Sequence, residues 1–276
     1  MKDGFYTCCL YFQQTAIVEQ LFGIYFFVLK TAAATAANCA DMPLLSAALE
    51  GMAHFSKFMS VDYYDDLFKT LGILLDSGKL TPHQSLNCIR SAFRMMQGEG
   101  ESLDVDPTRF YRHLYMVLSL GDFSKWPESD FIALLDCLDF MLLKRRKHLS
   151  DERLFAFAKR IATVAISCSP YSCYSLSLLC LLRSLFTIFP SLDRLLDPSP
   201  LRPGGIYRPD VDDPEHCSAE GSFLHELSLL QTSGCKVLSA FAKRFAMEYQ
   251  EGNSNQKQVK LQPGEVSIDL DAYCRM

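Results

Sequence analysis

Apolar residues recur at spacings of three and four positions along most of the chain, and long runs of alternating apolar and polar residues are missing. The first spacing is typical of an amphipathic helix and the second pattern of a strand, so the chain is expected to form about ten helices. We expect these helices to begin near Gln13, Pro43, Ser60, Thr81, Asp106, Pro127, Ser150, Ser172, Phe223 and Lys236.

Residues that favour helix ends support several of these boundaries. Thr81 and Asp106 are each followed directly by proline, which combines an N-cap residue with a first turn that needs no N–H donor. Ser150 precedes two acidic residues, which are favourable at the positive end of a helix dipole. Gly78 is suited to the position that ends a helix.

Helices of similar length joined by short turns predict an all-α fold of stacked antiparallel helix pairs, a HEAT-like or armadillo-like α-solenoid. No tight sequence repeat is visible, so the repeats are degenerate. We expect an N-terminal helix within residues 1–40, a helical repeat domain over residues 41–250 and a mobile tail over residues 251–276. Within the domain, the prolines, adjacent glycines and acidic residues of positions 190–218 predict an irregular segment.

The formal net charge of −5 provides no general attraction to nucleic acid, so a contact with phosphate would require a local basic cluster. Cations end one predicted helix and recur on the next, and they form our candidate surface for RNA or a partner protein: Lys144, Arg145, Arg146, Lys147, Lys159 and Arg160. Two interpretations stay open. The run stabilises the C-terminal end of its helix through the helix dipole, or it forms an exposed ridge, extended by the later pair, that faces an RNA backbone.

The sequence contains no recognisable pattern for a catalytic, cofactor or metal site. Glycine-rich phosphate loops, a nucleophile elbow and the HExxH metal motif are absent. The eleven cysteines include no CxxC pair and lie mostly in apolar runs, which favours free, buried thiols in a reducing compartment. His216 and Cys217, with Cys235 or His225, match no common zinc spacing. We therefore expect no metal, no cofactor and no enzymatic activity, but a binding function.

One stretch raises a membrane alternative. Residues 161–182 carry no formal charge, but Pro170 divides them and several serines make them only moderately apolar. We expect two core helices here, and an integral membrane protein stays as the alternative from another class. The first residues lack the pattern of a secretory signal peptide, because Gln13, Gln14 and Glu19 interrupt the apolar run.

Five segments of the chain resemble, in order, conserved blocks of the nucleolar complex protein 3 family. They are PLLSAALEGMAHF at 43–55, SLNCIRSAF at 85–93, DVDPTRFYRHLY at 104–115, CLDFMLLKRRK at 137–147 and YRPDVDDPEHC at 207–217. Each block is modestly specific, and their order over residues 43–217 makes the resemblance strong. Residues 1–11 match no block. The matching positions that we take as structural residues of the motifs are Glu50, Gly51, Asp106, Pro107, Phe110, Tyr111, His113, Tyr115, Pro209, Asp213, Pro214 and Cys217.

The resemblance implies an α-helical scaffold of the CCAAT-binding-factor type, located in the nucleus and nucleolus. It implies assembly with nucleolar complex protein 2 and other large-subunit assembly factors on precursors of the large (60S) ribosomal subunit, and hence with pre-rRNA. It also implies a second role at chromatin, with replication-origin proteins, in the initiation of DNA replication. None of these roles requires a small-molecule substrate, a cofactor or a membrane.

Overall fold

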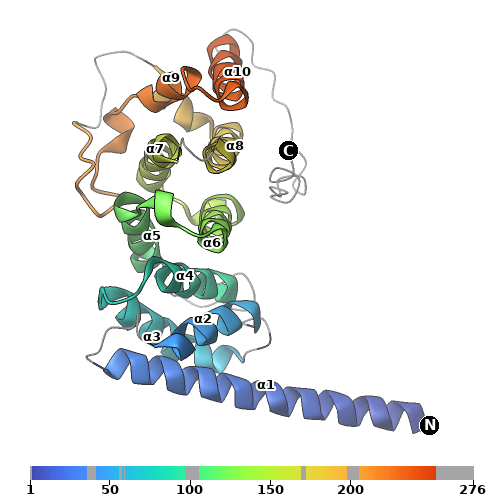
Figure 1. Ribbon diagram of the computed structural model, residues 1–276. Coiled ribbons are helices and arrows are strands. Elements are labelled where there is room, and N and C mark those ends of the chain that lie inside the picture. The colour runs from blue at the N-terminus through green and yellow to red at the C-terminus, as the bar shows by residue number, and fades with distance from the viewer. Residues whose placement is uncertain are drawn as a thin grey trace. The chain divides into compact units, whose positions relative to one another are not determined.

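The computed structural model describes residues 2–35, 42–55, 58, 60–96, 106–168, 172–197 and 205–252, and its regular structure consists of packed helices (Figure 1). Within these ranges there is no strand, and the predicted all-α, solenoid-like fold is confirmed. The chain forms two compact units. Unit 1 comprises Met1–Leu114 and Ile132–Phe140, and unit 2 comprises Tyr115–Phe131 and Met141–Met276.

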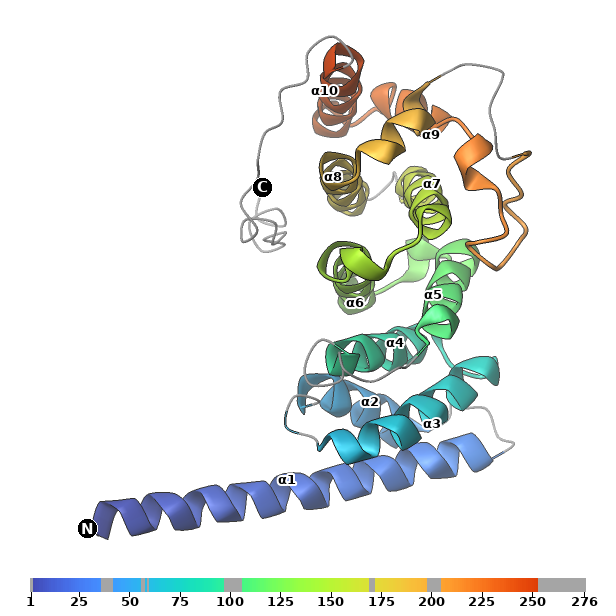
Figure 2. The same cartoon turned by 180° about the vertical axis from the view of Figure 1, so that it is seen from behind.

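Unit 1 is built on α1 (Lys2–Ala34), α2 (Pro43–Phe55), α3 (Tyr64–Asp76) and α4 (Pro82–Met96), with the first part of α5 (Thr108–Leu120) and the last part of α6 (Glu128–Leu138). A short 3-10 helix, η3 (Val61–Tyr63), leads into α3. The α2 helix packs on α4, and α1 runs along α2 and α3 (Figure 2). Leu49, Leu71 and Ile89 are fully buried between these helices. Burial of each such side chain contributes about 1.5–3 kcal/mol to folding.

Unit 2 contains α7 (Asp151–Ser167), α8 (Ser172–Ile188), α9 (His225–Gln231) and α10 (Lys236–Gly252). The pairs α7 with α8 and α9 with α10 each pack together, and α10 also contacts α8. Between them lie the 3-10 helices η8 (Pro190–Leu196) and η9 (Ala219–Gly221), and η5 (Phe123–Lys125) precedes α6. Phe157, Leu181 and Phe245 are fully buried in this core.

The helix starts predicted from Thr81 and Ser150 are confirmed. α4 begins at Pro82, and Thr81 and Gln84 form a reciprocal capping pair. The Thr81 hydroxyl accepts from the Gln84 N–H at 3.2 Å, and the Gln84 Oε1 accepts from the Thr81 N–H at 3.0 Å. The Ser150 hydroxyl accepts from the N–H of Arg153 at the start of α7. Gly78 has a φ of 64°, the left-handed conformation that ends a helix.

Two expectations about helices were wrong. α1 begins at Lys2 rather than near Gln13, and Ile17, one of its apolar residues at helical spacing, is 66% exposed. The apolar residues of α1 surround the helix, so their spacing does not identify the buried face. The helix expected to run through residue 147 ends as an α-helix at Leu138, continues as a π-helix (Asp139–Lys144) and is followed by a 3-10 turn (Arg146–His148). The expected tail lies outside the described residues after position 252.

The uncharged stretch at 161–182 is not one span, because α7 ends at Ser167 and α8 begins at Ser172. Among the described helices, residues Ala16–Ala34 of α1 are long and apolar enough to cross a membrane, and the sharply bent pair Cys173–Ile188 with Pro190–Leu196 passes the same test if counted together. Length and composition alone are weak grounds for a span, because core helices also satisfy them.

Candidate functional site

The basic run is at the junction between the π-helix and the 3-10 turn that precede α7 in unit 2. Lys144, Arg146 and Lys147 are exposed, and Arg145 is half-buried. Within the part of the chain that the structure describes, neither Arg146 nor Lys147 takes part in an ion pair. Cations at the C-terminal end of a helical segment are also favourable to its dipole. Three of the four cations of the run are therefore exposed to solvent, and the role of the run stays a prediction.

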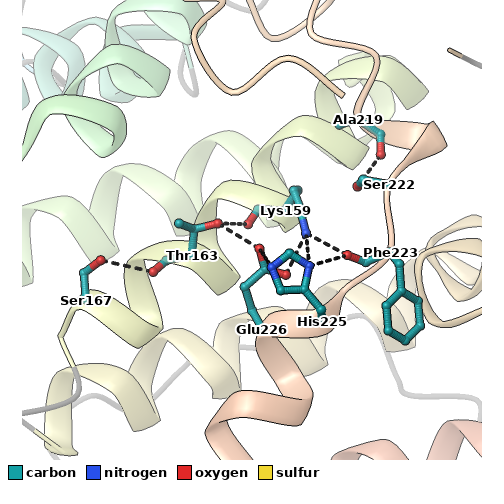
Figure 3. A network of polar contacts seen from close by, with 8 residues as sticks. All are labelled: Lys159, Thr163, Ser167, Ala219, Ser222, Phe223, His225 and Glu226. Carbon is teal, nitrogen blue, oxygen red and sulfur yellow. Dashed lines mark hydrogen bonds and ion pairs between the residues drawn. The ribbon is translucent and has the colours of Figure 1, made fainter. Parts of the chain in front are cut away.

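Lys159 does not extend this run, and its predicted exposure was wrong: the side chain is only 3% exposed. Its ammonium group donates to the Phe223 carbonyl at 2.7 Å and to Glu226 Oε2 at 2.7 Å (Figure 3). The His225 Nδ1 lies 3.3 Å from the same nitrogen. Glu226 is 4% exposed, and its other carboxylate oxygen lies 3.2 Å from the Thr163 hydroxyl. Lys159 and Glu226 thus form a buried, hydrogen-bonded ion pair that joins α7 to α9.

Arg160 is also buried, with 6% of its surface exposed, so its predicted exposure was wrong as well. Its Nη1 donates to the Ser119 hydroxyl at 2.9 Å, and its Nη2 donates to the Pro209 carbonyl at 2.9 Å. The guanidinium lies over the Tyr115 ring, 4.3 Å from its centroid. A planar cation on an aromatic face, with two neutral acceptors, is stabilised without a carboxylate partner.

Both cations are buried because the chain after α8 folds back across α7. The described part of the predicted irregular segment is held by its own contacts: the Arg208 N–H donates to the Cys217 carbonyl at 2.9 Å, and the Arg208 guanidinium to the His216 carbonyl at 2.8 Å. Arg153, on α7, pairs with Glu215 at 2.9 Å. Most acceptors for Lys159 and Arg160 therefore come from positions about 50 to 70 residues later, and Ser119 from 41 residues earlier. At such distances helical spacing carries no information.

These contacts border a pocket of about 390 Å³ between α7, α9 and the returning segment. Lys159, Arg160, Thr163 and Glu226 contribute polar groups to its wall, and Tyr207 and Pro209 contribute apolar surface. Burial raises the pKa of the Tyr207 and Tyr115 hydroxyls, so both phenols stay neutral at physiological pH. On this wall Glu226 is bonded to both Lys159 and Thr163, and Arg160 is bonded to Ser119 and Pro209.

The motif residues of unit 1 hold helices together. Asp106 Oδ1 accepts from the Thr108 N–H at 2.9 Å, and the Pro107 carbonyl accepts from the N–H groups of Phe110 and Tyr111. Since α5 begins at Thr108, the N-cap position is Pro107, one residue later than expected. Phe110 and Tyr111 are buried edge-on against Phe93.

Three further motif residues of unit 1 differ in their surroundings. His113 Nε2 lies 2.9 Å from Asp76. Gly51 of α2 faces the Tyr25 ring of α1 so closely that a Cβ there would collide with the tyrosine hydroxyl. Its neighbour Glu50 is exposed.

The motif residues of unit 2 hold the returning segment against α7. Tyr115 packs edge-on against Phe157 beneath Arg160. Pro209 accepts the Arg160 bond described above, and Asp213 accepts from the Glu215 N–H at 3.0 Å. Pro214 and Cys217 are buried, and the Cys217 thiol contacts the Pro214 carbonyl at 3.4 Å. Sequence reasoning did not identify Phe223, Thr163 and Glu226 as partners, and no local signal marks them.

No group of three or more histidine, cysteine, aspartate or glutamate side chains in the described ranges is placed to hold a metal ion. Every cysteine whose side chain is described is a free thiol, and those at positions 88, 137, 168, 180 and 217 are buried.

Comparison with known proteins gives a consistent result. The profile of the CBF/Mak21 family matches residues 85–242. The chain is 39% identical over 228 residues to the nucleolar complex protein 3 homolog of Xenopus laevis. This alignment covers 83% of this chain and 27% of that protein. It is 38% identical over 228 residues to the human homolog, with the same coverage of both chains. It is 37% identical over 217 residues to nucleolar complex protein 3 of Drosophila melanogaster, and this alignment covers 78% of this chain and 25% of that protein.

The chain thus spans about a quarter of the length of the relatives it matches. The matched profile includes the basic run, both buried cations and the segment that covers them, so these features lie within the shared region. The relatives' names indicate the nucleolus, and therefore the nucleus, as the compartment of this group.

Proposed function

Because the chain belongs to the CBF/Mak21 family, we propose that it is a non-enzymatic nucleolar scaffold in the biogenesis and maturation of the large ribosomal subunit. The observation that carries this proposal is its similarity, over 83% of its length, to proteins named nucleolar complex protein 3. The packed helices, in which buried polar groups serve stability, are consistent with a binding protein.

We propose that the exposed basic run contacts the phosphate backbone of pre-rRNA. The support is local: Lys144, Arg146 and Lys147 expose three cations within four residues on a protein whose net charge is −5. Backbone contacts need cationic side chains but no base-specific pocket, and they position an RNA rather than read its sequence. Because Lys159 and Arg160 are buried, the proposed contact is shorter than the six-residue surface considered from the sequence.

For the protein partner we propose another assembly factor of the same complex, nucleolar complex protein 2. The resemblance of the five sequence segments to the family supports this partner, and the exposed apolar side chains of the helices provide surfaces to which it can bind. Affinity purification of the tagged chain from nuclear extract is the direct test. Co-recovery of that protein, large-subunit assembly factors and pre-rRNA is the expected result, and their absence in the presence of correctly folded chain would contradict the scaffold proposal.

The RNA contact has a sharper test. Reversal of charge at Lys144, Arg146 and Lys147 to glutamate should weaken binding to a single-stranded RNA oligonucleotide. It should also reduce the slope of log K against log salt by about 2, since each lost phosphate contact removes about 0.7. Fluorescence anisotropy over a salt series measures both quantities.

The chain provides a matched control for this test. Lys236, Lys243 and Arg244 are three exposed cations on α10, and their reversal changes the net charge by the same amount. If both triple variants lose RNA affinity equally, the attraction is a property of total charge and the basic run has no special role. If neither loses it, the basic run is not the RNA contact, and the proposal for this surface is ruled out.

A further inference from the structure

Two arginines of α4 share one carboxylate of α6 in unit 1, and neither reaches it closely. Arg90 Nη1 lies 3.7 Å and Arg94 Nη2 lies 3.9 Å from the same atom, Asp136 Oδ2. Both separations are longer than the distance of about 2.7–2.9 Å at which a cationic N–H donates to a carboxylate. We call these three side chains the arginine cluster.

Arg90 is the member of the arginine cluster with the fewest contacts. Its side chain is 11% exposed, and its Nε is buried without a hydrogen-bond partner among the residues that the structure describes. A buried guanidinium loses the solvation of its charge, so it normally donates to acceptors on several sides. Two cations beside one acid leave one positive charge without compensation.

Arg94 is held in place, but its charge is not balanced either. Its Nη1 donates to the Ala53 carbonyl of α2 at 3.0 Å, and its guanidinium carbon lies 5.7 Å from the centroid of the Phe140 ring. Burial, and after it the charge of Arg90, lowers the pKa of Arg94. One further anion would therefore balance the charge of a pair of cations that the fold already positions.

The surroundings favour a single carboxylate over a nucleic acid. Unit 1 has nine lysine and arginine residues against fourteen aspartate and glutamate residues, so it carries the whole net charge of −5. A surface of this charge repels a polyanion such as RNA. Arg90 and Arg94 are also only 11% and 27% exposed, and a slender acidic side chain reaches such a pair more easily than a sugar-phosphate backbone does.

An apolar side chain lies at the rim of the arginine cluster. Ile132 precedes Asp136 by four positions on α6, so the two residues are neighbours on one face of that helix. Ile132 is 39% exposed. Arginine that is largely buried, next to an accessible apolar side chain, is typical of the centre of a protein–protein interface.

We propose that the arginine cluster binds an aspartate or glutamate side chain of a partner protein. This carboxylate accepts from the guanidinium groups of Arg90 and Arg94, and an apolar residue beside it contacts Ile132. The inference rests on the proposed scaffold function, because it describes how a protein partner is held. It does not depend on the proposed RNA contact, which involves unit 2 only.

Binding of a carboxylate can be followed at the guanidinium groups themselves. The probe is the α-amide of N-acetylglutamic acid, which carries one carboxylate, and it is titrated at constant ionic strength into the intact chain labelled with 15N-arginine. The Nε–Hε resonances of Arg90 and Arg94 should shift to saturation with a dissociation constant on the order of 10 mM. Arg112, exposed on α5 in the same unit, is the internal control, and its resonance should not saturate.

Two substitutions should change this affinity in opposite directions. Asp136→Asn removes the carboxylate that competes with the probe, so the probe should bind about tenfold more tightly. Arg90→Gln removes the buried cation, so the saturable shift of Arg94 should be lost. A general loss of structure cannot produce both results, and far-UV circular dichroism of each variant checks that the helices remain folded.

Affinity purification from nuclear extract connects the arginine cluster to the scaffold function. Arg90→Gln combined with Arg94→Gln should lower the recovery of large-subunit assembly factors by roughly fivefold or more. Arg109→Gln combined with Arg112→Gln is the matched control, because it removes the same charge from unit 1, and it should leave the recovery unchanged. If the unaltered chain recovers no assembly factor, the scaffold function fails, and the titration still decides whether the cluster binds a carboxylate.

Three results would overturn the proposal. One is a titration in which Arg90 and Arg94 do not shift to saturation, or in which Arg112 shifts as they do. Another is a pair of double variants that recover the assembly factors equally well, which would place the partner elsewhere. The third is saturation of both resonances by a single-stranded RNA oligonucleotide when the carboxylate probe has no effect, which would make the cluster a nucleic-acid site.

Discussion

Two groups of cations lie close together in the sequence of unit 2, and the structure gives them opposite environments. Lys144, Arg146 and Lys147 are exposed at the end of a helical segment. Lys159 and Arg160, about a dozen residues further on, are 3% and 6% exposed. By residue type the groups are alike. What differs is whether acceptors from a distant part of the chain cover them.

The comparison shows how burial changes the contribution of a charge. An exposed cation is stabilised by water and contributes little to folding. A buried cation loses that solvation and is stable only when protein acceptors replace it, as Glu226 and the Phe223 carbonyl do for Lys159. We therefore expect the buried pair to determine stability and the exposed run to be available for binding.

The largest effect should follow from removal of the Lys159 charge. Lys159→Met leaves Glu226 buried without its partner, and the free energy of unfolding should fall by about 3–5 kcal/mol. Urea denaturation monitored by circular dichroism measures this change. Replacement of both partners, Lys159→Met with Glu226→Met, should recover most of the loss because no uncompensated charge remains. A double variant as unstable as the single one would show that geometry, not charge, dominates here.

A smaller loss is expected at Arg160. Arg160→Met removes the bonds to Ser119 and Pro209 and the contact with the Tyr115 ring, and should lower stability by about 2–3 kcal/mol. The returning segment should loosen locally, so limited proteolysis should cut within residues 205–217 more rapidly than in the original chain. Equal cleavage rates would indicate that the segment is held by its other contacts, such as the pair between Arg153 and Glu215.

The exposed run should behave differently in the same assay. Triple reversal of Lys144, Arg146 and Lys147 to glutamate should change the unfolding free energy by about 1 kcal/mol or less, chiefly through the helix dipole. Urea denaturation alongside the Arg160→Met variant gives the comparison directly. A loss as large as that of Arg160→Met would mean that the run is a structural element and not a free surface.

The smallest effect on stability is expected from substitution of an exposed cysteine. The cysteines, like the cations, include both buried and exposed residues. Burial raises the pKa of the Cys137 and Cys168 thiols to about 12, and that of Cys180 to about 11. At pH 8 the thiolate fraction of a group with a pKa of 12 is about one in 10,000, so alkylation should be slow. Among the cysteines whose side chains the structure describes, exposed Cys173 should react first, and Cys173→Ser should leave stability unchanged. Mass spectrometry after a short iodoacetamide pulse identifies the modified positions, and labelling of Cys137 as rapid as that of Cys173 would contradict this ordering.

Local features of the sequence determined the helices and most of their boundaries. The start of α4 at Pro82, after Thr81, and that of α7 after Ser150 depend on side chains that satisfy N–H groups within the same turn. The all-α class follows from helical periodicity, which also depends only on neighbours three and four residues away. The exposure of Lys144, Arg146 and Lys147 could be expected for the same reason, because cations at a helix end need no distant partner to reach solvent.

Only the tertiary structure decided which face of a helix is covered and which charges are buried. Lys159 and Arg160 read as surface residues because their acceptors, at Glu226 and Pro209, lie about 50 to 70 positions later. The inner face of α1 could not be assigned either, since its apolar residues surround the helix and packing on α2 and α3 selects among them. Gly51 is small because the Tyr25 ring of another helix occupies the space of a side chain. In each case the deciding interaction joins residues far apart in the chain, and periodicity, which reports only local geometry, carries no trace of it.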